Sequence, residues 1–554
     1  MSGIKEELVR GLTPRSLVIS VSLLIISIII GDIQWLYSEK PWVFHGWFVP
    51  FVYIILINEV LGRINKRLRL TSQELLVIFP SMFFAAGKNY VLAGITAGEI
   101  IFSELHWNLE LTAFALNIGD LRDVFAELTP WFMFPTGPEG MEIARIIQEG
   151  LKPGEALNWG LLTVPILYWS AVMVLMFFIM QFLVFAIVGQ PWTEVERLVF
   201  PMAVPYMYTI NRAGDVDPAT NKSRLFDLKD PRMKVFWAGL IVGILLTAIP
   251  ALYEVFPPLA ILEAFQWGET PVRFEPLVAA LPGARGWACL IIAQALLWLL
   301  LPNEVYYTSI AMWIVFGVLY QWLGVMTGVI AYEPGMEYRW PWEAVPQWWA
   351  PLPYGLIATT GIMLGIGAWN LWFLRSRIKR LASVFKGGED IVEHGLSMRF
   401  MTRFGVASIL LFLILMVVTG VPVVIAVIFL ALWFLWLVQV TRCWSEIWWH
   451  EGNFAVQGNI WNYYHNIGAA MGYWPMEATW EVPNMSYAWY ATNRITFATS
   501  TWVVRHYPMG EGNLALLYKM AHYNKLDLKD LFTITLIIGV VGSVFATIWQ
   551  IWML

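Results

Sequence analysis

The stretch that decides the fold is residues 157–188, LNWGLLTVPILYWSAVMVLMFFIMQFLVFAIV, which contains no charged residue. A helix that crosses a bilayer needs about 20 mostly apolar residues, and this run exceeds that length. We therefore expect a transmembrane helix that tilts strongly in the membrane or projects beyond it.

The remainder of the chain has the same character. Of its 554 residues, 58% are apolar and 14% are charged, whereas soluble domains contain about 25% charged residues. Ten further apolar runs cover residues 17–30, 47–61, 74–86, 235–253, 287–301, 309–331, 354–374, 404–419, 421–438 and 532–553. We therefore predict an all-α, polytopic integral membrane helix bundle of roughly 11–14 spans, forming one transmembrane domain over residues 1–554.

Basic residues between the runs predict the orientation, because cytoplasmic loops of membrane proteins carry an excess of lysine and arginine. Alternating the spans puts four basic segments on one side of the membrane: residues 5–15 and 63–69, and the loops 208–234 and 375–403. The region 104–156 is acidic, and we expect it to form an external loop region. The pattern predicts a multi-pass protein of the cell membrane with a cytoplasmic N-terminus.

Several classes of protein are excluded by composition and by missing motifs. The 35 basic and 40 acidic residues give a net charge of −5, so no basic field favours nucleic acid. Cys289 and Cys443 are too few for a disulfide framework or a cysteine-based zinc site. The motifs HExxH, GxSxG and GxxxxGK[ST] are absent. We therefore expect no enzyme, no cofactor and no metal, and any transport would be secondary, driven by an ion or a proton.

The most concentrated ionisable group of residues lies in GQPWTEVERLVFP, residues 189–201. Glu194 and Arg197 are three apart on a helix and can form an ion pair that closes its cytoplasmic end. Alternatively, Glu194 or Glu196 titrates or binds a cation in a partly dehydrated cavity. An ionisable group at the membrane is a functional hypothesis by default, because its burial is costly.

Two segments have a broken pattern. In AAGKNYVLAGITAG, residues 85–98, Lys88 and Asn89 separate two short apolar stretches, and Pro201 and Pro205 interrupt another. Irregular backbone at membrane depth is tolerated only beside protein or a water-filled cavity, and such segments often mark transport sites. We predict a re-entrant or unwound segment in which Lys88 pairs with Glu99, Glu194 or Glu196. A surface helix and a proline kink are the alternatives.

A third group of polar residues lies later in the chain. Asn303 and Glu304 follow Pro302 between two apolar runs, and Arg442 and Glu446 are four apart on one helix face. They begin a Trp-rich, amphipathic stretch, residues 443–531, that we expect to be interfacial or re-entrant. The predicted solute or ion pathway comprises Lys88, Asn89, Glu99, Glu194, Glu196, Arg197, Asn303, Glu304, Arg442 and Glu446.

A weak internal repeat is also present. LTPRSLVISVSLLIIS, residues 12–27, parallels LSMRFMTRFGVASILLFL, residues 396–413, and each precedes a second apolar run and basic residues. Halves of this kind often frame the substrate site of transporters. The pattern is compatible with a two-fold internal repeat.

Five landmarks then permit a comparison with a known family. LTSQELLVI, the run at 157–188, WTEVERLVFPM, RLFDLKDPRMKVFWAG and TRCWSE occur in this order between about residue 70 and about residue 450. This order resembles a prokaryotic family of polytopic membrane proteins described as oligopeptide-transporter-like. The NPG and KIPPR signatures of the better-known oligopeptide transporters are absent. The resemblance implies an ion- or proton-coupled secondary transporter of a small organic solute, including peptide-like solutes.

The resemblance also implies partners, and two other functions stay open. The expected partners are the lipid bilayer, the solute and a coupling cation, and the protein can be a homo-oligomer. One alternative is a membrane scaffold or assembly protein without transport. The other is a membrane-embedded glycosyltransferase, because IWWHEG resembles the WWDxG motif of oligosaccharyltransferases and Asp32 follows the first run. In this motif His450 replaces the aspartate.

Overall fold

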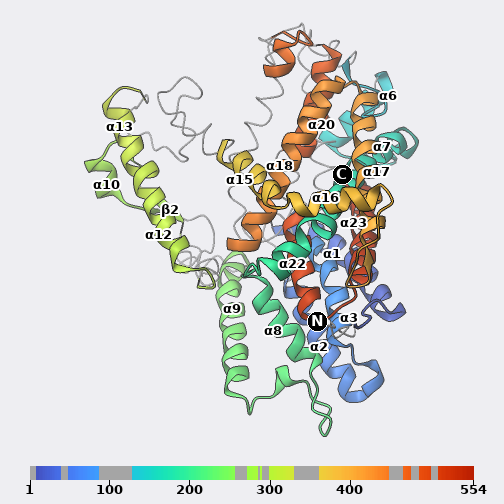
Figure 1. Cartoon of the computed structure of the whole chain (residues 1–554), viewed down its shortest axis with the longest axis vertical. Coiled ribbons are helices and arrows are strands. Elements are labelled where there is room, and N and C mark those ends of the chain that lie inside the picture. Colours follow the sequence, from blue (N-terminus) through green and yellow to red (C-terminus); the bar gives the residue numbers. More distant parts are fainter. Residues whose placement is uncertain are drawn as a thin grey trace. The chain divides into compact units, whose positions relative to one another are not determined.

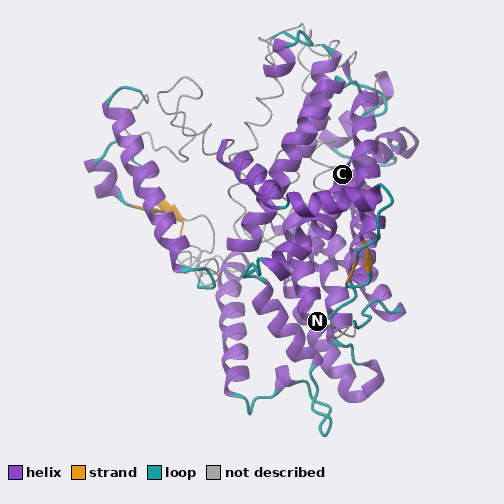
Figure 2. Cartoon of the chain, viewed as in Figure 1, coloured by secondary structure: helices purple, strands orange, loops and turns teal. Residues whose placement is uncertain are grey.

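The computed structural model describes most of the chain. The described residues are 8–38, 48–85, 128–135, 137–255, 271–284, 287–289, 299–329, 361–447, 466–475, 486–500 and 510–553. Figure 2 shows them almost entirely as helix, and the only strands among them form two short antiparallel pairs. The prediction of an all-α polytopic membrane protein is confirmed, because five of the described helices are long and apolar enough to cross a membrane.

The chain divides into two compact units. The first contains residues 1–226, 367–445 and 460–554, and the second contains 227–366 and 446–459. Elements of the first unit are α1 (Pro14–Ser38), α2 (Phe48–Ile64), α3 (Ser72–Ile78), α6 (Gly137–Glu149), α7 (Trp159–Phe182), α8 (Ala203–Gly214), α16 (Arg375–Phe385), β3 (Val392–Glu393), β4 (Leu396–Ser397), α17 (Met398–Thr419), α20 (Tyr487–Ser500), α22 (Glu511–Tyr523), α23 (Leu528–Met553) and most of α18 (Val423–Ile447) (Figure 1). The second contains α9 (Pro231–Val255), β1 (Pro271–Arg273), α10 (Glu275–Ala280), β2 (Trp287–Cys289), α12 (Asn303–Met312) and α13 (Gln321–Met326), and α15 (Ile362–Phe373) crosses the boundary.

Helix α7 forms the centre of the first unit, as its apolar sequence predicts. It begins at Asn158, whose side chain accepts a hydrogen bond from the N–H of Gly160. Its neighbours include α17, α22 and α23, and Trp169 and Phe177 on it are fully buried. In a bilayer such side chains stabilise helix packing through van der Waals contact, because lipid tails are as apolar as they are. A helix that is apolar on all sides is expected at such a central position.

The helical path continues beyond α7 in an altered form. A π-helix covers Leu183–Val188, and a second π-helix covers Pro191–Val195. The main-chain carbonyl of Ala186 accepts a hydrogen bond of 3.0 Å from Nε of Arg377 on α16. π-Helical turns are rare and are frequently found at functional sites. The long run at 157–188 is therefore one helix whose last turns are widened.

Two of the expected spans are described only in part, and their described residues do not form one continuous α-helix. Residues 74–85 form part of α3 and a 3-10 helix, Phe79–Ala85, because Pro80 lacks the N–H that a continuous α-helix requires. The run at 287–301 begins with strand β2, which pairs with β1 between Trp287 and Arg273. The other runs lie partly outside the described residues or form the helices named above.

Strands β3 and β4 form a hairpin whose turn is His394 and Gly395. Glu393 pairs with Leu396 across the hairpin, and φ is +43° at His394 and +87° at Gly395. A two-residue turn with both φ values positive has the type I′ geometry that matches the twist of the strands. The turn is seated on the α22–α23 connection, since the N–H of Leu528 donates to the carbonyl of His394 at 2.9 Å.

Hydrogen bonds join the four basic segments at one end of the first unit. Arg15 donates to Glu74 at 2.5 Å and to the carbonyl of Arg67. Arg69 donates to the carbonyl of Asn221 at 2.7 Å, which connects the end of α2 to the loop after α8. These contacts bring the first three basic segments together.

The fourth basic segment reaches the same end through the C-terminal helices. The N–H of Val9 donates to the carbonyl of Lys525, and the N–H of Asp527 donates to the carbonyl of Val9. The next residue, Leu528, bonds to His394 in the 375–403 segment. The basic segments predicted to share one side therefore lie close together in the fold.

Candidate functional site

Glu194 lies in the second π-helix, just beyond the end of the longest apolar helix. Its carboxylate accepts a hydrogen bond of 3.0 Å from Nε2 of Gln190, one turn earlier. The side chain is 28% exposed. It is therefore shielded by the protein and still accessible to an ion.

His394 contacts the same carboxylate from the turn of the β3–β4 hairpin. Its Nε2 lies 2.5 Å from Oε1 of Glu194. A positive φ is uncommon for a residue other than glycine, and strained backbone of this kind costs about 1–3 kcal/mol. A Cβ at Gly395 would lie 2.3 Å from Oδ1 of Asp527, so only glycine fits this seat. The hairpin thus holds His394 in place despite the strain.

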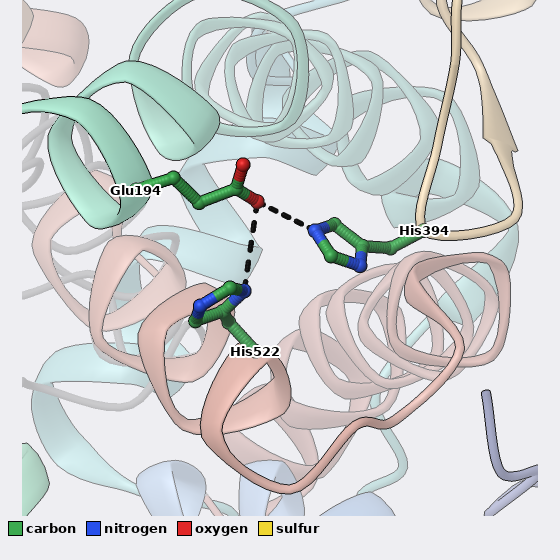
Figure 3. Close-up of side chains that lie close together, drawn as sticks. All are labelled: Glu194, His394 and His522. Carbon is green, nitrogen blue, oxygen red and sulfur yellow. Dashed lines mark hydrogen bonds and ion pairs between the residues drawn. The ribbon is translucent and has the colours of Figure 1, made fainter. Parts of the chain in front are cut away.

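His522 completes the cluster from α22, near the C-terminal end of that helix. Its Nδ1 lies 3.5 Å from Oε1 of Glu194. Figure 3 shows both imidazole rings pointing toward this one carboxylate oxygen from different elements. The rings are nearly perpendicular, at 82°, and their centroids are 5.3 Å apart. One ligand atom from each of the three residues lies within 4.8 Å of the others.

The electrostatics of the cluster favour an ionised Glu194. The hydrogen bond from His394 lowers the pKa of Glu194 and outweighs the opposing effect of burial. The hydrogen bond from Gln190 also lowers the pKa of Glu194, and so do the charges of His394 and His522. Glu194 is therefore an ionised carboxylate that holds both imidazole rings around one of its oxygens.

A second set of side chains surrounds the cluster. Arg377 forms an ion pair with Glu393, the residue before His394, with Nη2 at 2.7 Å from Oε2. Tyr518 lies one turn before His522 on α22, and its buried hydroxyl has no hydrogen-bond partner in the part of the chain that the structure describes. Burial, and to a lesser extent Glu393 and Glu194, raises the pKa of Tyr518 well above its usual range. A neutral hydroxyl donor therefore lies one turn from His522 on the same helix.

Lys519 is a separate buried cation beside this segment. Its Nζ donates to the carbonyl of Thr193 at 3.3 Å and lies 4.9 Å from the ring centroid of Tyr523 and 5.5 Å from that of Phe200. Burial lowers the pKa of Lys519. Cation–π contacts offset part of the cost of this burial.

The structure separates the predicted pathway residues of the 189–201 segment. The carboxylate of Glu194 contacts the two histidines, whereas Nε of Arg197 donates at 3.4 Å only to the main-chain oxygen of Glu194. The ion pair of Glu194 with Arg197, one of the two alternatives for this segment, is not formed in the described structure. Glu196 instead pairs with Arg442 at 2.5 Å, and Arg442 also stacks over the ring of Trp192.

The other predicted pathway residues lie in the second unit or outside the described residues. Asn303 and Glu304 are exposed in the first turn of α12, and Glu446 at the end of α18 also belongs to the second unit. Lys88, Asn89 and Glu99 lie outside the described residues, so the predicted break there stays a prediction. Asp32 lies within α1, and nothing is described of its side chain.

Sequence analysis missed both histidines and expected no metal ligands. Of seven histidines in the chain, two lie among the described residues, and both are in the cluster. His394 and His522 are 200 and 328 residues from Glu194, so no local spacing connects them. The one available signal was the histidine–glycine pair between two short β-prone stretches, which is compatible with a hairpin turn.

Comparisons with known proteins give one match. A family model described as "Family of unknown function (DUF6785)" matches residues 6–554. No curated protein matches this chain, and no solved structure does.

Proposed function

The chain belongs to the DUF6785 family of unknown function, and from its site we propose that it is a cation-coupled secondary transporter of a small organic solute. The observation that carries this proposal is the Glu194 cluster. An ionised carboxylate lies in a widened helical segment, directly after a buried apolar helix, and two histidines from distant segments converge on it. π-Helical turns are frequently found at functional sites, and secondary transporters commonly place coupling-ion sites where a transmembrane helix departs from regular α-helix.

The origin of the three side chains supports coupling. Glu194 comes from the extension of α7, His394 from a hairpin turn, and His522 from α22. A cation bound between them would favour the arrangement in which all three elements meet, and its release would favour their separation. A ligand shifts a conformational equilibrium only through such a difference in affinity between the states.

The orientation of the protein is part of the same proposal. The basic segments meet at the end of the first unit that also carries His394. By the positive-inside rule this end faces the cytoplasm of a cell membrane, and the N-terminus lies there too. The cation site then opens toward the cytoplasm, and the partners are the bilayer, the solute and the cation.

A scaffold without transport is the second candidate, and one observation favours it. Large side chains fill the described interior of the first unit: Trp169, Trp433 and Trp436 are fully buried, as are Phe177 and Phe185. Dense packing of this kind suits a rigid assembly platform as well as a transporter in one of its closed states.

Reconstitution into liposomes tests the proposal. The purified protein is placed in vesicles on a solid-supported membrane, and currents are recorded on addition of free amino acids, dipeptides or dicarboxylic acids. We expect a solute-dependent current with the native chain and none with Glu194→Ala. If a correctly folded native chain gives no current with any of these three classes, the transport proposal is rejected in favour of the scaffold.

A further inference from the structure

We infer that Glu194, His394 and His522 form a binding site for one divalent transition-metal ion of the zinc class. The inference rests on the proposed function, because it names the coupling cation of the transport site. The donor set comes first: one carboxylate oxygen and two imidazole nitrogens. Zinc binds these donors, whereas calcium and magnesium prefer oxygen ligands alone.

The spacing of the donors agrees with a single ion. Zinc lies about 2.0–2.1 Å from imidazole nitrogen and carboxylate oxygen, which places two ligands of a tetrahedral ion about 3.3 Å apart. The separation between Oε1 of Glu194 and Nδ1 of His522 is 3.5 Å, close to this value. Nε2 of His394, now at 2.5 Å from the same oxygen, needs to move outward by only about 1 Å, which a small rotation of the imidazole ring provides.

The surroundings of the three side chains are compatible with a metal site. The side chains of the three residues are between 23% and 28% exposed, and the ligating Nδ1 of His522 is itself buried. The buried hydroxyl of Tyr518, one turn before His522 on α22, has no hydrogen-bond partner among the described residues. Metal ligands commonly receive outer-shell hydrogen bonds, and this hydroxyl is a donor that makes none of the described hydrogen bonds.

The number of ligands indicates what the metal could do. Structural zinc sites are closed by four protein ligands, whereas sites that act on a ligand have three and keep one position open. The cluster offers three. A carboxylate or amino group of the transported solute can fill the open position, so that solute and metal would bind together at the end of α7.

Metal binding by the purified protein tests this inference. The full chain, purified in detergent with a tag that contains no histidine, is treated with a chelator and titrated with Zn²⁺ against a chromophoric competitor. We expect one tightly bound equivalent, with its affinity lowered more than about 100-fold in Glu194→Gln, His394→Asn and His522→Asn, because loss of a direct ligand exceeds the 10–100-fold cost of losing an outer-shell partner. Titration with Co²⁺ should give visible ligand-field bands that these variants lose.

Controls separate the site from background binding and from misfolding. Glu142→Gln removes a carboxylate that pairs with Arg145 on the exposed face of α6, and it should bind Zn²⁺ like the native chain. His394→Asn keeps a residue type that tolerates positive φ, so the hairpin should form. Size-exclusion chromatography and thermal unfolding establish which variants are folded.

The outcomes distinguish this inference from the proposed function. A native chain that binds no Zn²⁺, or folded variants that bind it as the native chain does, would overturn the metal site. If Zn²⁺ binds as expected but no solute moves, the metal site stands and transport fails. If solute currents persist unchanged in the presence of a strong chelator, transport stands and the metal is not its coupling ion.

Discussion

At the scale of single residues, the first unit keeps several side chains that folding alone would not favour. His394 has a strained backbone at the tip of a hairpin, and Lys519 is a cation buried with one hydrogen bond. Violations of local rules at one place in a protein are expected at functional sites. Both residues lie near Glu194, which agrees with the assignment of the site to this region.

Lys519→Met should raise the melting temperature of the detergent-solubilised protein. Methionine keeps the apolar stem and removes a charge whose desolvation is only partly offset. Because the pKa of Lys519 is lowered in the folded state, the native chain gains stability as the pH rises from the folded pKa toward the unfolded value of 10.5. The advantage of the variant should therefore be largest at neutral pH and shrink in alkaline solution. A variant less stable than the native chain at neutral pH would show that the ammonium stabilises the fold.

Glu196→Gln should cost little stability and, unlike Glu194→Gln, should leave Zn²⁺ binding intact. Glu196 is 35% exposed and its partner Arg442 is 17% exposed, so their pair is screened by solvent and contributes about 1 kcal/mol or less. Thermal unfolding should show a small decrease in melting temperature, and Zn²⁺ affinity should be unchanged. A loss of Zn²⁺ binding as large as that in Glu194→Gln would place Glu196 in the site.

At the scale of elements, the position of α22 depends on a close approach to the extension of α7. A Cβ at Gly189 would lie 2.6 Å from the ring of Tyr518 and 2.6 Å from the carbonyl of Val184. The absence of a side chain lets α22 come near enough for His522 to reach Glu194. The cluster is therefore a product of helix packing and not only of its three residues.

Gly189→Ala should destabilise the protein by about 1–3 kcal/mol, the usual cost of overpacking an interior, and should weaken Zn²⁺ binding by moving His522. Gly239→Ala is the matched control, because a Cβ at Gly239 on α9 meets nothing within 4 Å and alanine favours a helix. Thermal unfolding and Zn²⁺ titration of both variants measure the effect. Equal behaviour of the two variants would contradict the packing argument.

Sequence reasoning reached some of these elements and not others, for physical reasons. Helix α7 was predicted because its apolar run determines its fold locally, and Glu194 was selected because a carboxylate beside such a run is costly. The two histidines that contact Glu194 could not be predicted, because they are 200 and 328 residues away in the sequence and only the tertiary fold brings them together. The change from α-helix to 3-10 helix near Pro80 was not predicted, because the length of the apolar run at 74–86 does not reveal it.

At the scale of the whole molecule, hydrogen bonds hold the four basic segments together at one end of the first unit. The sequence predicted that they share one side of the membrane, and in the fold they are joined by hydrogen bonds from Arg15, Arg69, Val9 and Leu528. The two results have different origins, since one comes from loop charges and the other from contacts between helices. Their agreement makes the topology a strict prediction, because these segments cannot lie on opposite faces while the contacts exist.

Cysteine labelling measures this topology directly. In a chain with Cys289 and Cys443 replaced by serine, single cysteines are introduced at Arg67, Lys222 and Lys386, and at Lys152 in the region expected outside. A membrane-impermeant maleimide on intact cells should label only the cysteine at position 152, and the other three should react only after the cells are permeabilised.

The cysteines at positions 67, 222 and 386 must all be labelled from the same side of the membrane, because contacts between their segments hold them at one end of the first unit. If all three react from outside and position 152 does not, the orientation is reversed but the fold stands. If the three positions divide between the two sides, the hydrogen-bonded end of the unit does not exist in the membrane. The Glu194 cluster, which depends on the hairpin at that end, would then be lost with it.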